Sequence, residues 1–229
     1  MATARGGEQH IPRPPRARPG DPPPWAHLGE ARRAVTIDQV RRAVKTAAPG
    51  RPIAATLPAA RAAAVLVPLF EEDGLARLIL TRRAGHLPSH RGEVAFPGGK
   101  LHPGESAERG ALREAAEEVG IAPADVEIIG ALDELATVAG RFVLSPVVGV
   151  LPTRPALTPD PGEVARAFDV SIADLLDEQT YHEERWELPG IGERPMYFFE
   201  LAGETVWGAT ARIVHELLVL VTDADAGGR

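Results

Sequence analysis

The sequence predicts a mixed α/β fold, and three observations support this prediction. Short apolar runs bounded by Gly, Pro and Asp recur from Arg61 onward, and runs of this kind are typical of strands. Two or three segments of helical pattern lie between and after these runs. The composition, with 44% hydrophobic and 25% charged residues, is that of a soluble globular chain rather than a fibrous or low-complexity one.

The first expected element is a short amphipathic helix, Ile37–Thr46, which Thr36 caps and which ends at Ala47-Ala48-Pro49-Gly50. Further helices are expected at residues 106–119, 171–176 and 210–221. Strands are expected at residues 62–70, 77–81, 94–96, 126–129, 142–151 and 197–201. No repeat of fixed period is visible in the sequence, which argues against a solenoid or a propeller.

The chain divides at about residue 30. Residues 1–30 hold seven prolines between Pro12 and Pro24, interleaved with arginines, and show no apolar periodicity. We therefore expect a disordered tail at residues 1–30, followed by one domain at residues 31–225. The tail is either a basic segment that contacts an acidic partner or nucleic acid, or a solvated leader without a fixed role.

Composition also excludes several classes of protein. The longest uncharged apolar stretch, residues 142–153, is shorter than the roughly 18 residues that span a membrane. The amino terminus lacks the apolar region of a secretory signal. A net charge of -7 argues against a protein that mainly neutralises nucleic-acid phosphates. The absence of cysteine excludes disulfides and thiolate chemistry and fits a cytoplasmic protein.

The segment that suggests chemistry is a glycine-containing loop followed by the helix expected at residues 106–119. On that helix, Leu112, Ala115, Ala116 and Val119 follow helical spacing and form an apolar stripe. We place Glu114, Glu117 and Glu118 on the opposite face, where like charges at i, i+3 and i+4 repel by about a few tenths of a kcal/mol per pair. Such a group is either a solvated acidic face or a site for a hard divalent cation, which prefers oxygen ligands.

The residues around this helix resemble the signature of the Nudix hydrolase family. Gly99, Glu105, the pair Arg113-Glu114, the pair Glu117-Glu118 and Gly120-Ile121 reproduce the pattern Gly-x5-Glu-x7-Arg-Glu-U-x-Glu-Glu-x-Gly-U, where U is a bulky aliphatic residue. The sequence departs from it at one specified position, where Ala115 replaces the aliphatic residue inside the box. This resemblance implies an α/β/α sandwich with a mixed β-sheet between helices.

The same resemblance implies a reaction and a set of residues. Nudix hydrolases cleave nucleoside diphosphates linked to another moiety and use Mg²⁺ or Mn²⁺. The matching metal ligands are Glu114, Glu117, Glu118 and the carbonyl of Gly98, with Glu117 and Glu118 also catalytic. Gly98 and Gly99 would contact the substrate. Arg113 would pair with Glu105 and hold the loop against the helix.

Upstream of the box, the sequence is similar to the additional signature of the coenzyme A pyrophosphatase branch. Arg83, Ala84, Gly92 and the run Phe96-Pro97-Gly98-Gly99 fall in register with it, and Pro88 stands where that signature has an arginine. This similarity implies Arg83 as a substrate-binding residue, because guanidinium groups pair well with phosphate. It also implies coenzyme A or acyl-coenzyme A as substrate, with 3′,5′-ADP and 4′-phosphopantetheine as products.

Three further points stay open at this stage. The water-activating residue is expected to be a carboxylate outside the helix, and Glu163 is the candidate, with an ordinary loop residue as the alternative. Pro88 favours a different substrate, such as ADP-ribose, a dinucleotide or a damaged nucleoside triphosphate. A nucleotide-sensing module without catalysis is the remaining alternative. The expected partner is a small nucleotide, with no membrane and no nucleic acid, and a homodimer is compatible with the sequence.

Overall fold

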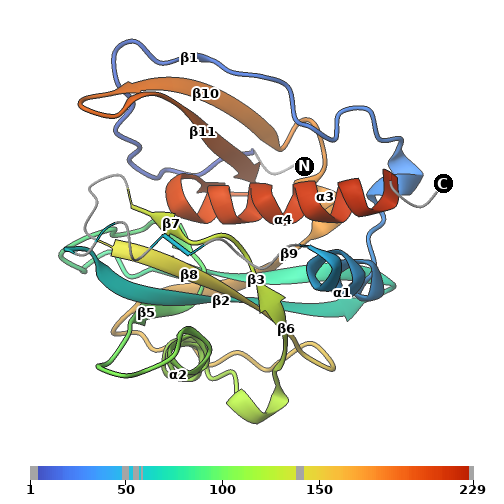
Figure 1. Ribbon diagram of the computed structural model, residues 1–229, viewed down its shortest axis with the longest axis vertical. Coiled ribbons are helices and arrows are strands. Elements are labelled where there is room, and N and C mark those ends of the chain that lie inside the picture. Colours follow the sequence, from blue (N-terminus) through green and yellow to red (C-terminus); the bar gives the residue numbers. More distant parts are fainter. Residues whose placement is uncertain (1–4, 48–51, 54–56, 58, 138–141, 227–229) are drawn as a thin grey trace.

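The computed structural model describes residues 5–47, 52–53, 57, 59–137 and 142–226, and these residues form stacked layers (Figure 1). An eight-stranded sheet carries helix α2 (Ala107–Val119) on one face. Helices α1 (Ile37–Thr46) and α4 (Gly208–Ala226) cover the other face. The predicted mixed α/β fold, with a mixed sheet between helices, is confirmed. A second sheet of four strands lies beyond α4 and was not expected from the sequence.

The eight-stranded sheet is built around two long central strands that run parallel to each other, β2 and β8. All other strand pairs in this sheet are antiparallel, and the main path has the order β4-β3-β2-β8-β6. Off this path, β5 pairs with β2, β7 with β8 and β9 with β3. The strands are β2 (Arg61–Glu72), β3 (Leu75–Arg83), β4 (Val94–Ala95), β5 (Gly98–Lys100), β6 (Glu127–Ala131), β7 (Leu135–Ala136), β8 (Phe142–Val150) and β9 (Val164–Ser171).

Strand β2 shows why its apolar run is continuous rather than alternating. Leu66 and Phe70 pack into the core beneath α2, whereas Val67 and Leu69 pack into the core on the side of α1 and α4. Successive strand residues point to opposite faces, so a strand covered on both faces needs apolar residues throughout.

The helices agree with the predicted boundaries to within a few residues. Thr36 and Gln39 form a capping box at the start of α1, as the sequence predicted for the cap. A short helix, α3 (Ile172–Leu175), follows β9, with Ser171 as its cap. Helix α4 is longer than expected, because it begins at Gly208 and continues to Ala226 between the two sheets. The helices of the described residues do not combine the length and apolarity that crossing a bilayer requires.

The predicted apolar stripe on α2 is corrected by the structure. Ala111, Ala115 and Val119 are buried, whereas Leu112 and Ala116 are only partly buried. The helix is therefore rotated toward its smallest side chains, which allow it to lie close to β2. This rotation buries Glu118, which is 3% exposed, instead of leaving it on the solvated face with the other carboxylates.

The expected disordered tail is also corrected, within the described residues 5–30. Strand β1 (Arg18–Pro19) pairs with β10, and the side chain of Trp25 is fully buried against Tyr181 and Phe199. Widely spaced apolar residues anchor this extended segment, although they show no periodicity that sequence analysis would detect. Residues 1–4 lie outside the described part of the chain.

The four-stranded sheet has the order β1-β10-β11-β12 and is antiparallel throughout. Its other strands are β10 (Tyr181–Leu188), β11 (Gly192–Leu201) and β12 (Glu204–Val206). The predicted strand at residues 197–201 is the end of β11. Strands β9 and β10 were missed because charged residues interrupt their apolar pattern.

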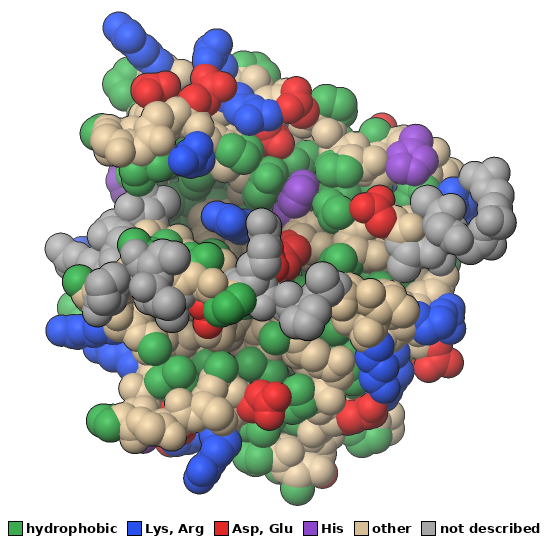
Figure 2. Space-filling model, in the orientation of Figure 1, with side chains coloured by type: hydrophobic (Ala, Val, Ile, Leu, Met, Phe, Trp, Pro, Cys, Tyr) green, Lys and Arg blue, Asp and Glu red, His purple; other side chains and the backbone are tan. Residues whose placement is uncertain are grey.

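On the face seen in Figure 2, basic side chains are interspersed with acidic ones rather than joined in one stripe.

Candidate functional site

The loop before α2 lies so close to strand β2 and helix α2 that a Cβ at either of two glycines would meet neighbouring atoms. A side chain at Gly98 would overlap the backbone of Ala64 and place its Cβ 2.6 Å from Cα of Val65. A Cβ at Gly99 would lie 2.5 Å from the carboxylate of Glu114. These close approaches place the loop backbone directly against the acidic helix.

Arg113 is the centre of an ion-pair network on the solvent side of α2. Its Nε and Nη2 donate to the two carboxylate oxygens of Glu105, at 2.9 and 3.0 Å, and Nη2 also donates to the carbonyl of Lys100. Its Nη1 lies 2.8 Å from Glu114 and 3.2 Å from Glu117. Arg113 thus links the loop to three of the four acidic residues that the signature specifies.

This network lowers the pKa of Glu105. The hydrogen bond from Arg113 is the main cause that lowers its pKa to about 2, and the amide of His102 contributes a second hydrogen bond. A carboxylate with so low a pKa keeps its charge across the physiological range. Glu105 and Arg113 therefore form a permanent ion pair that joins the loop to the helix.

Glu118 has the opposite environment. Its carboxylate is buried, accepts a hydrogen bond of 3.1 Å from the amide of Gly98, and lies 3.7 Å from Nη1 of Arg83. Burial raises its pKa to about 7, although Gly98 and Arg83 partly offset this effect. The negative charges of Glu163 and Glu114 raise it further.

Arg83 reaches Glu118 from the end of strand β3, where the pairing with β9 is irregular. Arg82 pairs with Arg166, but Arg83 pairs with Val164, so Ala165 is an extra residue in β9. Such a bulge redirects side chains and is common beside active sites. The Nε atom of Arg83 is buried and has no hydrogen-bond partner among the described residues.

Glu163 is brought to the site by the loop that precedes β9. In this loop, the amide of Thr158 donates to the carbonyl of Val119 and the amide of Asp160 donates to that of Glu118. The loop therefore follows the carboxyl end of α2, beyond the left-handed cap at Gly120. The carbonyl of Glu163 accepts a hydrogen bond from the amide of Ala84. Glu163 is exposed, and its negative charge is close enough to Glu118 to raise the pKa of Glu118.

The structure thus brings most of the residues singled out in the sequence to one region, but it divides the carboxylates. Glu118 faces inward toward Arg83 and Gly98, whereas the side chain of Glu117 is 61% exposed and contacts Arg113. Within the described part of the chain, no three His, Asp or Glu side chains are already grouped at metal-ligand spacing. Pro88 is exposed. The sequence singled out Glu163 in the loop at residues 157–163, but it gave no signal for the contacts of this loop with the end of α2.

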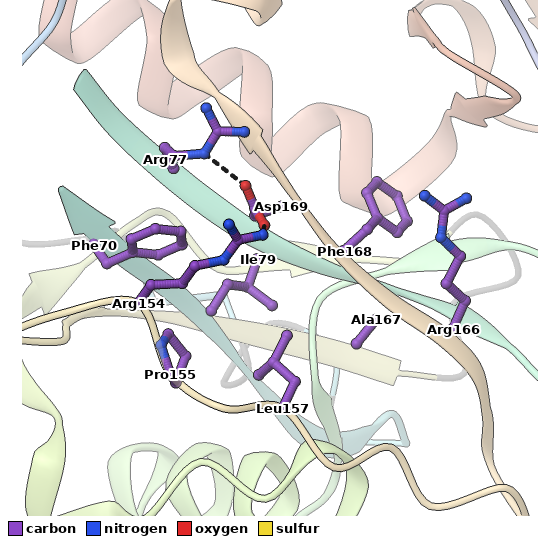
Figure 3. A pocket seen from close by; sticks show the side chains of 10 residues that line it. All are labelled: Phe70, Arg77, Ile79, Arg154, Pro155, Leu157, Arg166, Ala167, Phe168 and Asp169. Atoms are coloured by element: carbon purple, nitrogen blue, oxygen red, sulfur yellow. Dashed lines mark hydrogen bonds and ion pairs between the residues drawn. The ribbon is translucent and has the colours of Figure 1, made fainter. Parts of the chain in front are cut away.

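A hollow of about 460 Å³ is bordered by β3, β9 and the segment that ends at Leu157 (Figure 3). Arg77 and Arg154 both contact the carboxylate of Asp169 there, each at 2.6 Å. The lining includes none of the acidic residues of α2. Its residues are Phe70, Arg77, Ile79, Arg154, Pro155, Leu157, Arg166, Ala167, Phe168 and Asp169.

Comparisons with known proteins agree on the nature of this fold. The family model described as the NUDIX domain matches residues 60–191. A Photorhabdus laumondii protein named uncharacterized Nudix hydrolase NudL is 40% identical over 158 residues, which cover 69% of this chain and 83% of that protein. A Yersinia pestis protein with the same name is 39% identical over 158 residues, or 69% of this chain and 78% of its own.

Among solved structures, a MutT/nudix family protein from Enterococcus faecalis matches 85% of this chain and 72% of its own, with a TM-score of 0.51 and 16% identity. At this identity, the likeness concerns the fold alone.

Proposed function

The chain belongs to the Nudix hydrolase family, and on this premise we propose that it is a divalent-metal-dependent pyrophosphohydrolase that cleaves coenzyme A or acyl-coenzyme A. The products would be 3′,5′-ADP and 4′-phosphopantetheine or its acyl form. The observation that carries the proposal is the position of Arg83. This residue belongs to the upstream signature of the coenzyme A branch, and its guanidinium lies 3.7 Å from the buried carboxylate of Glu118.

The donor set fits a hard cation by its chemistry. Glu118 is a carboxylate whose pKa is raised by burial and, to a smaller extent, by neighbouring carboxylates, and Glu114 lies directly against the loop at Gly99. We propose that Glu114, Glu117, Glu118 and the Gly98 carbonyl would hold Mg²⁺ or Mn²⁺. Such an ion supplies charge neutralisation for the diphosphate and lowers the pKa of a bound water.

The chain's own residues then have separable tasks. Arg83 binds a diphosphate oxygen, for which its unpartnered Nε and its partly exposed guanidinium are suited. Glu163 accepts the proton of the attacking water at its carboxylate, since it is exposed and lies close to Glu118. Gly98 and Gly99 let the substrate approach the loop backbone. Glu105 and Arg113 hold that loop in place.

A second candidate substrate class follows from Pro88. The coenzyme A signature has an arginine at this position, and the loss of a phosphate-binding side chain there favours ADP-ribose, a dinucleotide or a damaged nucleoside triphosphate. A sensing module is disfavoured, because the chain retains Arg113 and all the carboxylates that hydrolysis requires. We also propose, from the cysteine-free sequence, that the enzyme works in the cytoplasm.

The test is a substrate panel with purified protein and Mg²⁺ or Mn²⁺. Coenzyme A, acetyl-coenzyme A, ADP-ribose, a diadenosine polyphosphate and an oxidised dGTP are compared at equal concentration, with products identified by mass spectrometry. Release of 3′,5′-ADP and phosphopantetheine at the highest kcat/KM supports the proposal. Turnover of another compound without phosphopantetheine release rejects coenzyme A as substrate. Absence of any turnover, with metal bound, favours the sensing module.

A further inference from the structure

A buried carboxylate on the opposite side of the sheet from α2 connects four distant parts of the chain. Glu204, in β12, is 1% exposed. Its oxygens lie 3.5 Å from Nη1 of Arg82 and 3.7 Å from Nη1 of Arg166, and one of them accepts a hydrogen bond from Nε2 of Gln9. Strands β3, β9 and β12 and the amino-terminal segment therefore meet at this one side chain.

The two arginines that Glu204 holds are the pair immediately before the β-bulge. Arg82 and Arg166 are partners in the β3–β9 register, and the register shifts between Arg82 and Arg83. Because consecutive strand residues point to opposite faces, Arg82 faces Glu204 while Arg83 faces Glu118. The contact of Arg82 with Glu204 and that of Arg83 with Glu118 therefore lie on opposite faces of the same strand end.

The bulge also determines which part of β9 lies beside the site. With Ala165 unpaired, Val164 lies opposite Arg83, and the carbonyl of Glu163 accepts from the amide of Ala84 at 2.8 Å. Regular pairing would place Ala165 opposite Arg83 and move Glu163 one residue along the strand. The positions of Arg83 and Glu163 therefore both depend on the bulge.

We propose that Glu204 is a positioning residue that fixes the β3–β9 bulge through Arg82 and Arg166, and so holds Arg83 and Glu163 beside Glu118. This inference rests on the proposed function, since it assigns catalytic value to the placement of these two side chains. It also gives the amino-terminal segment a role, because Gln9 supplies the third partner of the Glu204 carboxylate.

The chain offers a matched control for this proposal in Asp169. Its carboxylate is also largely buried, with a side chain 8% exposed, and it also holds an arginine of β3, Arg77, at 2.6 Å. Asp169 pairs with Ile79, however, well away from the bulge. Loss of either carboxylate removes a buried charge that contacts an arginine of β3, and only Glu204 contacts the residues at the bulge.

The experiment compares Glu204→Gln with Asp169→Asn in the full chain, using whichever nucleotide the wild type hydrolyses. We expect Glu204→Gln to lower kcat about tenfold, because Glu163 is misplaced in the transition state, and to raise KM, because Arg83 binds the diphosphate. Asp169→Asn should keep kcat within about twofold. Equal losses in both variants, or a lower melting temperature of Glu204→Gln with unchanged kcat, would overturn the proposal.

Hydrogen–deuterium exchange provides a readout that needs no substrate. The amide of Arg83 donates to Glu93 and that of Gly92 donates to Arg83, so both report on the end of β3. Glu204→Gln should accelerate their exchange, whereas Asp169→Asn should not, and unaltered exchange in Glu204→Gln counts against the proposal. If the wild type hydrolyses nothing in the panel, the proposed function fails, and exchange alone decides whether Glu204 positions the bulge.

A second variant covers the case in which Glu204→Gln does not fold. Arg82→Gln removes one of the three groups that contact the Glu204 carboxylate. Since the side chain of Arg82 is 36% exposed, the substitution should be tolerated. It should accelerate exchange of the same two amides and lower kcat by about threefold, a smaller effect because Arg166 and Gln9 remain. Wild-type exchange and kcat in Arg82→Gln would contradict the proposal.

Discussion

Two glutamates of the same signature, Glu105 and Glu118, lie in opposite electrostatic environments. Glu105 accepts two hydrogen bonds from Arg113, and its pKa falls to about 2. Glu118 is buried, has its nearest cation at 3.7 Å, and its pKa rises to about 7. The surroundings therefore divide the signature into two parts. Glu105 belongs to a structural part, which is permanently charged and paired, and Glu118 belongs to a reactive part, whose charge is incompletely compensated.

The strongest test of this division is Glu118→Gln. We expect kcat to fall on the order of 100-fold, as for loss of a key electrostatic group. In EDTA, the same variant should have a melting temperature at or above that of the wild type, because it removes a buried charge that burial disfavours. Glu127→Gln is the control, since Glu127 is an exposed glutamate paired with Arg41. A Glu118 variant that melts well below the wild type would show that its charge stabilises the fold.

Substitution of the loop glycine Gly98 tests whether the backbone of the loop must lie close to β2. Gly98→Ala forces its Cβ against the backbone of Ala64 and Val65, and should lower the free energy of unfolding by about 2–3 kcal/mol. Urea denaturation measures this loss. Gly85→Ala is the control, because a Cβ there meets nothing within 4 Å. Equal stability of the two variants would mean that the loop can move away from β2.

His215 tests whether burial shifts a base as it shifts an acid. Burial lowers its pKa to about 4, and its ring stacks on Tyr197 at 3.9 Å between centroids. The unfolded chain binds a proton near pH 6.5 and the folded chain only near pH 4, so His215 destabilises the fold as pH falls through this window.

The expected loss of stability from His215 is about 3 kcal/mol, developed progressively as pH falls from 6.5 to 4. Chemical denaturation of the wild type and of His215→Phe at several pH values measures it. Since phenylalanine keeps the aromatic ring and cannot be protonated, stability of this variant should fall less over the window. Parallel pH profiles for the two proteins would contradict the assignment.

Arg113→Lys addresses the structural part and should have the smallest effect. Lysine keeps the charge but lacks the planar fork that contacts both oxygens of Glu105. We expect the Mn²⁺ concentration needed for half-maximal activity to rise about tenfold, because the loop is held less firmly. Arg109→Lys, at an exposed position of the same helix, should leave it unchanged. An identical rise in both variants would show that the contact with Glu105 is not its cause.

The amino-terminal segment and helix α2 show where sequence reasoning reached its limit. The loop-helix signature was visible because its spacing is local, and the cap of α1 was visible for the same reason. Burial of Trp25 was not visible, because its partners Tyr181 and Phe199 are far away in the sequence. The rotation of α2 that buries Glu118 was also missed, since periodicity alone does not distinguish a stripe of small residues from one of larger residues.

The sequence by itself determined the family, the mixed α/β class, most helices and central strands, and the identity of the acidic residues, because these depend on local spacing and side-chain chemistry. Tertiary structure alone decided which glutamate is buried, where the β-bulge places Arg83 and Glu163, and how Glu204 joins strands from distant parts of the chain. These features depend on contacts between residues far apart in the sequence, and such contacts arise only when the sheets and helices pack together.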